Sequence, residues 1–244
     1  MTEKKYTNPA TIALHAGWRK DETTNSVTVP IHMTSSYQFD STDHAANLFA
    51  LSELGNIYSR IMNPTNAVFE ERIAALEGGV AALGLASGQA ASAYAIQNLC
   101  SNGDNFVASS HLYGGTYNQF KNPFSDMGIE VRFVDPSDPQ NFADATDDKT
   151  RAYYGEVLPN PSFQVFPLQE VADIGRPLGI PLIVDNTAAP LICRPFDHGA
   201  AIIIHSATKY IGGHGTSIGG VIVDGGDFDW EANPERQPKL NNPD

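Results

Sequence analysis

Residues 201–210 read Ala-Ile-Ile-Ile-His-Ser-Ala-Thr-Lys-Tyr, an apolar run that leads into a lysine with hydroxyl side chains nearby. The apolar part predicts a buried strand, with Lys209 at its end. A second apolar run, residues 181–184, is followed by Asp185. Ligands of open α/β sheets bind outside the carboxyl ends of the strands, so Lys209 and Asp185 are expected to share one site.

A lysine and a carboxylate in this arrangement are what pyridoxal phosphate requires of a protein. An amine holds this cofactor as a Schiff base, and a carboxylate keeps its pyridine nitrogen protonated. Each residue alone has an ordinary alternative, because most lysines are solvated and an aspartate after a strand is often a turn or helix cap. Their shared position at neighbouring strand ends favours the cofactor site.

The rest of the chain predicts an α/β fold with a mostly parallel sheet and helices on both faces. Strands are expected at residues 82–86, 105–109, 130–134, 151–155, 181–185, 201–205 and 220–223, and helices at 66–76, 90–99 and 168–174. Residues 1–60 show little regular pattern beyond a short helix at about 43–51. The predicted organisation is an N-terminal arm, residues 1–60, followed by a large cofactor-binding domain, residues 61–244.

Donors for the cofactor phosphate are expected from both sides of the site. Ser87-Gly88-Gln89 follows a predicted strand and precedes an alanine-rich helix, so free backbone N–H groups face an anion and Gly88 permits close approach. A plain strand-to-helix turn is the alternative for this tripeptide. Ser206 and Thr208 alternate beside the lysine, where their hydroxyls reach toward the same phosphate.

Three further side chains suit the same cofactor. Tyr58 and Arg60 offer a phenol and a fork-shaped guanidinium for the phosphate. Tyr113 follows the predicted strand 105–109 in a glycine-bordered loop, where an aromatic ring stacks on a pyridine ring; a packed loop aromatic is the alternative.

Five stretches carry a family resemblance: Tyr58-Ser59-Arg60-Ile61-Met62-Asn63-Pro64-Thr65, Ser87-Gly88-Gln89, Tyr113-Gly114-Gly115-Thr116, Asp185-Asn186-Thr187 and Ser206-Ala207-Thr208-Lys209-Tyr210. Together they resemble the transsulfuration (Cys/Met metabolism) family of pyridoxal-phosphate enzymes, from about residue 11 to the last residue. Within the family, residues 87–91 and 212–220 are similar to the O-acetylhomoserine sulfhydrylase subfamily. Cystathionine synthases and γ-lyases usually carry Ser-Gly-Met and Asn-Gly-His there.

The resemblance implies a fold type I pyridoxal-phosphate transferase and adds site residues. Tyr58 and Arg60 are expected to reach the site of a neighbouring subunit in a dimer of dimers, with the arm crossing over that subunit. Tyr113 is expected to help deprotonate the incoming amine, and Thr187 and Gln89 to contact the cofactor. Asn160, in the spacing Glu156-x-x-x-Asn-Pro, is expected beside cofactor or substrate, although residues 157–159 depart from the family's usual small and polar residues.

The implied reaction is γ-replacement on O-acetylhomoserine by sulfide or a small thiol, which gives homocysteine or methionine and acetate. Lys209 is expected to be buried and near neutral, so that its freed amine removes the Cα proton. Cystathionine γ-synthase and methionine or cystathionine γ-lyase activities share every residue named and stay open as alternatives. A non-catalytic scaffold is a further alternative, although it would not need Lys209, Asp185, Arg60 and Tyr113 together.

Composition limits the partners. The 244 residues include 28 acidic and 15 basic side chains, a net charge of −13, which disfavours nucleic acid and anionic membranes. The polar start lacks a signal-peptide pattern and no apolar run approaches membrane-spanning length, so a cytoplasmic protein is expected. Cys100 and Cys193 are expected to be reduced, and His205 and His214 to be a packed residue and a loop residue without a metal.

The end of the chain carries one more expectation. The polar stretch through Asn241-Asn242-Pro243-Asp244 resembles an internal loop of the family. The family's smaller C-terminal domain, with the arginine that binds the substrate carboxylate, is therefore expected to be missing from these residues.

Overall fold

The computed structural model describes residues 6–241. These residues divide into two compact units, the first ending at Ala75 and the second beginning at Leu76. Each unit is described by itself. The division falls near the end of helix α3 (Pro64–Glu77), whereas the sequence places the boundary at residue 60. Across residues 6–241 there is no helix with the length and apolar character needed to span a bilayer.

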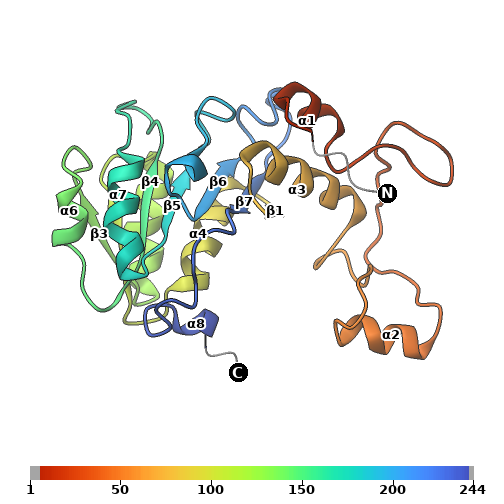
Figure 1. Ribbon diagram of the computed structural model, residues 1–244, viewed down its shortest axis with the longest axis horizontal. Helices are drawn as coiled ribbons and strands as arrows, with labels where there is room; N and C mark the ends of the chain where they lie inside the picture. The colour runs from red at the N-terminus through yellow and green to blue at the C-terminus, as the bar shows by residue number, and fades with distance from the viewer. Residues whose placement is uncertain (1–5, 242–244) are drawn as a thin grey trace. The chain divides into compact units, whose positions relative to one another are not determined.

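The second unit is built on one seven-stranded sheet with the order β1-β7-β6-β5-β4-β2-β3 (Figure 1). Its strands are β1 (Ala81–Leu85), β2 (Asn105–Ser109), β3 (Glu130–Val134), β4 (Thr150–Glu156), β5 (Leu182–Asp185), β6 (Ile202–Ser206) and β7 (Gly220–Asp224). The strands β3, β2, β4, β5 and β6 run parallel, and β7 is antiparallel to both β6 and β1. The predicted mostly parallel sheet is confirmed, with strand ends within one residue of expectation.

Two apolar layers cover the sheet because alternate residues of each buried strand point to opposite faces. On one face Tyr154, Ile183 and Ile204 pack in a cluster with α4 (Gly88–Leu99). On the other face Tyr153 and Val184 pack in a cluster with α7 (Leu168–Gly175). Helices therefore lie on both faces, as the near-continuous apolar runs of the strands predict.

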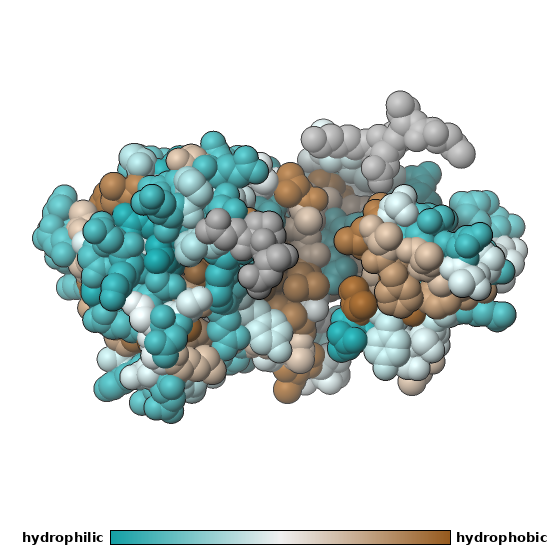
Figure 2. Space-filling view, turned by 90° about the horizontal axis from the view of Figure 1, so that it is seen from below, coloured by the Kyte–Doolittle hydropathy of each residue, from teal (hydrophilic) through white to brown (hydrophobic). Residues whose placement is uncertain are grey.

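Shorter elements complete the second unit: α5 (Gly114–Gln119), η1 (Phe120–Phe124), α6 (Gln140–Asp144), η2 (Arg176–Leu178), η3 (Pro195–His198) and α8 (Pro238–Asn241). Hydrophilic side chains cover much of this unit on the face that Figure 2 shows, in keeping with the net charge of −13.

The first unit contains α1 (Pro9–His15), α2 (Thr42–Phe49) and most of α3. The sequence predicts α2 and α3 but not α1, which begins with an Asn8 cap and a proline at its first position. Both are ordinary helix-start signals. The helix buries only Ile12, which leaves too little apolar periodicity to reveal it.

Candidate active site

The carboxyl ends of β5 and β6 bring Asp185, Thr187 and Ser206 together. Asp185 lies opposite Ile204 in the parallel register of these strands. The Thr187 N–H donates to Asp185 Oδ1 at 2.9 Å, and the Ser206 N–H donates to Thr187 Oγ1 at 2.7 Å. Burial raises the pKa of Asp185, against the hydrogen bonds from Thr187, which lower it. The carboxylate is thus fixed in place by neutral donors in a partly dry environment.

The start of α4 lies against the same strand ends. The Ser87 side chain caps the helix by accepting the Ala90 N–H at 3.1 Å. A methyl group on Gly88 would lie 2.7 Å from Ser206 Cβ, so only glycine lets the helix approach β6 this closely. Gln89 extends this region toward α5, because its Nε2 donates to Thr116 Oγ1 at 3.1 Å. Gly88, at the start of α4, therefore lies beside Ser206. Phosphate binding by the N–H groups of this helix start stays a prediction.

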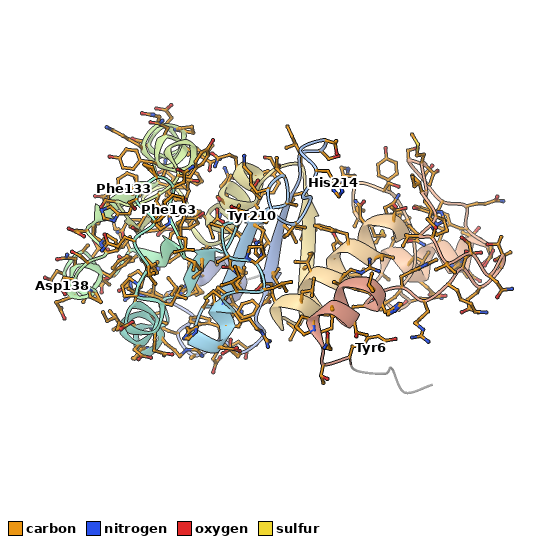
Figure 3. All side chains as sticks on the ribbon, turned by 90° about the horizontal axis from the view of Figure 1, so that it is seen from above. Tyr6, Phe133, Asp138, Phe163, Tyr210 and His214 are labelled. Carbon is orange, nitrogen blue, oxygen red and sulfur yellow. The ribbon has the colours of Figure 1, made fainter. Side chains whose placement is uncertain are left out.

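Lys209 lies in the turn that follows β6, and its side chain is exposed. The expectation of a buried lysine was wrong for this structure, because the strand ends at Ser206 and the next residues leave the core. Thr208 anchors the turn: its Oγ1 accepts the Gly219 N–H at 3.1 Å and lies 3.3 Å from the Gly219 carbonyl. Figure 3 shows Tyr210 and His214 on the loop beyond the lysine.

The end of β4 adds a second carboxylate to the site. Glu156 lies opposite Asp185 in the β4–β5 register and is only 6% exposed. Its Oε1 accepts the N–H of Tyr113 at 2.7 Å, so the predicted aromatic residue is tied to the strand ends. Burial and the neighbouring Asp185 raise the pKa of Glu156 to about 8. The side chain of Asn160 is exposed, in the loop just past this strand.

Tyr58 and Arg60 belong to the first unit, so the structure tests only their local arrangement. Both side chains are exposed, and the Arg60 guanidinium carbon lies 5.5 Å from the centre of the Tyr58 ring. The backbone here is held by the Ser59 N–H, which donates to the Ser35 carbonyl at 2.8 Å. The two side chains therefore present a cation and a phenol together on one surface.

Sequence reasoning missed a buried cluster on the opposite face of the sheet. His205 is fully buried, as predicted, but its Nε2 lies 2.6 Å from Glu77 Oε1. Asn186 Nδ2 lies 3.4 Å from the same oxygen and 3.0 Å from the Cys193 carbonyl. His205 and Glu77 are 128 positions apart, and a partner at that separation leaves no local pattern.

The sheet order defines an α/β protein, and polar side chains gather at the carboxyl edge of its mostly parallel sheet, where ligands of such folds bind. The family can be stated more closely. Residues 10–240 match the model of the Cys/Met metabolism PLP-dependent enzyme family, and the chain belongs to this family.

Named relatives agree with this membership. The chain is 55% identical over 223 residues to O-acetyl-L-homoserine sulfhydrylase of Leptospira meyeri, covering 91% of this chain and 50% of that protein. It is 50% identical to homocysteine/cysteine synthase of Saccharomyces cerevisiae, over 96% of this chain and 53% of that protein. The chain thus spans about half the length of the curated relatives it matches.

A solved structure shows the same fold. It is described as an O-acetylhomoserine (thiol)-lyase of Campylobacter jejuni and contains a pyridoxyl-lysine monophosphate. Its TM-score is 0.92 at 39% identity, over 95% of this chain and 57% of that one.

The residues at the strand ends fit the cofactor of this family. Asp185, a carboxylate at the strand ends held by neutral donors, suits a cation such as a protonated pyridine nitrogen. Gly88 lies close to Ser206, so the N–H groups at the start of α4 and the Ser206 hydroxyl are near enough to contact one phosphate.

Proposed function

We propose that the protein containing this chain catalyses γ-replacement on O-acetylhomoserine by sulfide or a small thiol. Homocysteine or methionine is formed, and acetate is released. The relatives at 50–55% identity, named for this chemistry, support the proposal. The structural observation that carries it is the meeting of Asp185, Ser206 and Gly88 at the ends of β5 and β6.

The residue roles follow from this arrangement. We propose that Lys209 holds pyridoxal phosphate as a Schiff base and that Asp185 pairs with its ring nitrogen. The phosphate is bound by the start of α4, at Gly88 and Gln89, and by the hydroxyls of Ser206 and Thr208. Thr187 orients Asp185, Tyr113 stacks on the ring, and Asn160 contacts the ring hydroxyl or the substrate.

Bound pyridoxal phosphate supplies an electron sink that acidifies the Cα–H bond of the amino acid. The Lys209 amine takes that proton, and its position in a turn beyond β6, not inside the core, lets it reach the substrate carbon. Loss of a second proton from Cβ then expels acetate from Cγ. Sulfide adds at Cγ, and protons return to the carbon atoms, so the acetate group is exchanged for a thiol. Asp185 keeps the ring nitrogen protonated throughout.

Assembly belongs to the same proposal. Tyr58 and Arg60 enter the site of a neighbouring subunit in a homotetramer, where the arginine binds the phosphate. Their paired exposure in the first unit supports this role. The protein is proposed to work in the cytoplasm on amino-acid metabolites.

The direct experiment is borohydride reduction of the purified protein, followed by peptide mapping. The expected product carries the reduced cofactor on Lys209. Lys239 is an internal control, because its Nζ already donates to the Gln97 and Cys100 carbonyls at 2.6 and 2.8 Å. A label on Lys239 or on another lysine would overturn the assignment.

The acceptor is tested separately. Acetate release from O-acetylhomoserine should be fast with sulfide and slow with cysteine. Faster formation of cystathionine from cysteine, or release of ammonia without an acceptor, would favour a cystathionine γ-synthase or a γ-lyase instead.

A further inference from the structure

Burial of the Glu156 side chain opposes the ionisation of its carboxyl group. It is only 6% exposed and lies beside Asp185 in the parallel register of β4 and β5. A second carboxylate in a dry site opposes ionisation of the first, so neither fold stability nor the ring-nitrogen role of Asp185 explains its presence. The hydrogen bonds of Glu156 indicate a different role.

Those hydrogen bonds reach a loop that is distant in sequence. Glu156 Oε1 accepts the N–H of Tyr113 at 2.7 Å across 43 positions. Tyr113 is the residue before α5, and the start of this helix has no side-chain cap of its own. The backbone N–H of Asn160 also hydrogen-bonds the Glu156 carboxyl. One buried side chain thus holds two segments that flank the proposed cofactor ring.

The Tyr113 side chain has little other support on the open side. It is 49% exposed, and its ring lies over Gly115 of the same loop, where a Cβ would be 2.5 Å from Tyr113 Cε1. Packing alone therefore restrains this loop weakly, and the bond from β4 supplies a fixed point one residue from the start of α5.

We propose that Glu156 is a positioning residue that holds Tyr113 in place against the ring bound by Asp185. The proposal rests on the proposed function, in which Tyr113 and Asp185 contact that ring. Glu156 itself touches neither substrate nor reacting atoms; it acts through the backbone of Tyr113.

The first test needs no cofactor. In the cofactor-free protein, Glu156→Ala should speed hydrogen exchange of the Tyr113 amide by about tenfold to a hundredfold, as expected for a lost bond to a carboxyl group. Exchange in strand β4 should stay unchanged. Glu156→Gln keeps an acceptor oxygen and should restore most of the protection. Where the alanine variant does not fold, Glu156→Asp, which draws the acceptor back by one methylene, should expose the same amide.

The second test uses the protein loaded with pyridoxal phosphate. Glu156→Ala should lower kcat by about tenfold or more with a smaller change in KM, because a misplaced ring contact affects the chemical step more than binding. Glu156→Gln should recover much of kcat. The matched control is Glu231→Ala, at an exposed glutamate outside the site, with wild-type exchange and kinetics expected.

Three results would overturn the proposal: an unchanged Tyr113 exchange rate in Glu156→Ala or Glu156→Asp, an equal loss of protection in the glutamine variant, or a loss spread evenly over β4. The last result would mean a purely structural role. Failure of borohydride to label Lys209 in the wild-type protein would instead refute the proposed function, and the exchange data would still decide the role of Glu156.

Discussion

Replacing Gly88 with alanine tests the close contact between the start of α4 and β6, where the cofactor phosphate is proposed to bind. The added methyl carbon would lie 2.7 Å from Ser206 Cβ and 2.9 Å from Ser206 Cα. Carbon atoms in contact are normally about 3.5–4.0 Å apart, so the start of α4 must move away from β6 by roughly 1 Å. The contact includes backbone, which cannot rotate aside as a flexible side chain would.

Two effects on stability oppose each other. Overpacking in a buried site costs about 1–3 kcal/mol, whereas glycine to alanine in a helix returns up to about 1 kcal/mol. We expect a net loss of about 1–2 kcal/mol in the free energy of unfolding. Phosphate binding suffers more, because a displaced helix start loses a charge-assisted hydrogen bond of about 1.5–3 kcal/mol. Pyridoxal phosphate should therefore bind about tenfold to a hundredfold more weakly.

Urea denaturation of the cofactor-free protein measures the first effect, and titration with pyridoxal phosphate measures the second. The matched control is Gly114→Ala, since no atom lies within 4 Å of the methyl position there. Its stability should stay within about 0.5 kcal/mol of wild type. Wild-type cofactor affinity in a folded Gly88→Ala protein would refute phosphate binding at the start of α4.

Three further changes test the other parts of the site. Asp185→Asn should leave cofactor binding largely intact but lower turnover by several orders of magnitude, because an unprotonated ring is a poor electron sink; near-normal turnover would assign this carboxylate another role. Inactive Arg60→Ala chains mixed with inactive Lys209→Ala chains should regain activity, because one site of each hybrid carries both groups; verified hybrids without activity would place Arg60 elsewhere. Burial and Asp185 raise the pKa of Glu156 from 4.5 to about 8, so between these pH values the folded state keeps a proton that the unfolded chain has lost. The free energy of unfolding of the cofactor-free protein should therefore fall as the pH rises from about 4.5 to about 8. Glu156→Gln should flatten this dependence in urea titrations near the two limits, and equal slopes in both proteins would contradict the assignment.

The sheet could be predicted from the sequence because its strands are short, continuous apolar runs bounded by turns. Residues 105–109 and 130–134 match β2 and β3 without change. The same logic placed Asp185 and Ser206 at one edge, because parallel strands end together. Helix η1 could not be predicted from apolar periodicity, because it contains Pro123. Its Phe120 and Phe124 pack against Phe106, a contact that no local pattern in the sequence indicates.

The side-chain partners of the site were much less predictable. Glu77 and His205 meet only after the sheet has formed, so neither neighbourhood in the chain indicates the other. The bond from Glu156 to the Tyr113 backbone likewise joins the end of β4 to a loop 43 positions away, and the sequence indicated only Asn160 as a site residue of that segment. The end of β6 was placed within one residue, but the burial expected for Lys209 failed because the sequence does not show that the turn after this strand leaves the core.

Three carboxylates at the sheet differ in their partners: Glu77 lies on one face, and Asp185 and Glu156 lie on the other. Glu77 Oε1 lies 2.6 Å from His205 Nε2, a partner within the protein. Asp185 and Glu156 lie opposite each other in the β4–β5 register. Their hydrogen bonds come from neutral donors: Thr187 donates to Asp185, and the N–H groups of Tyr113 and Asn160 donate to Glu156. Burial raises the pKa of both. A pair in this condition costs the empty protein stability and returns it when a cation arrives. A protonated pyridine nitrogen is such a cation, in keeping with the proposed pairing of Asp185 with the ring nitrogen of the cofactor.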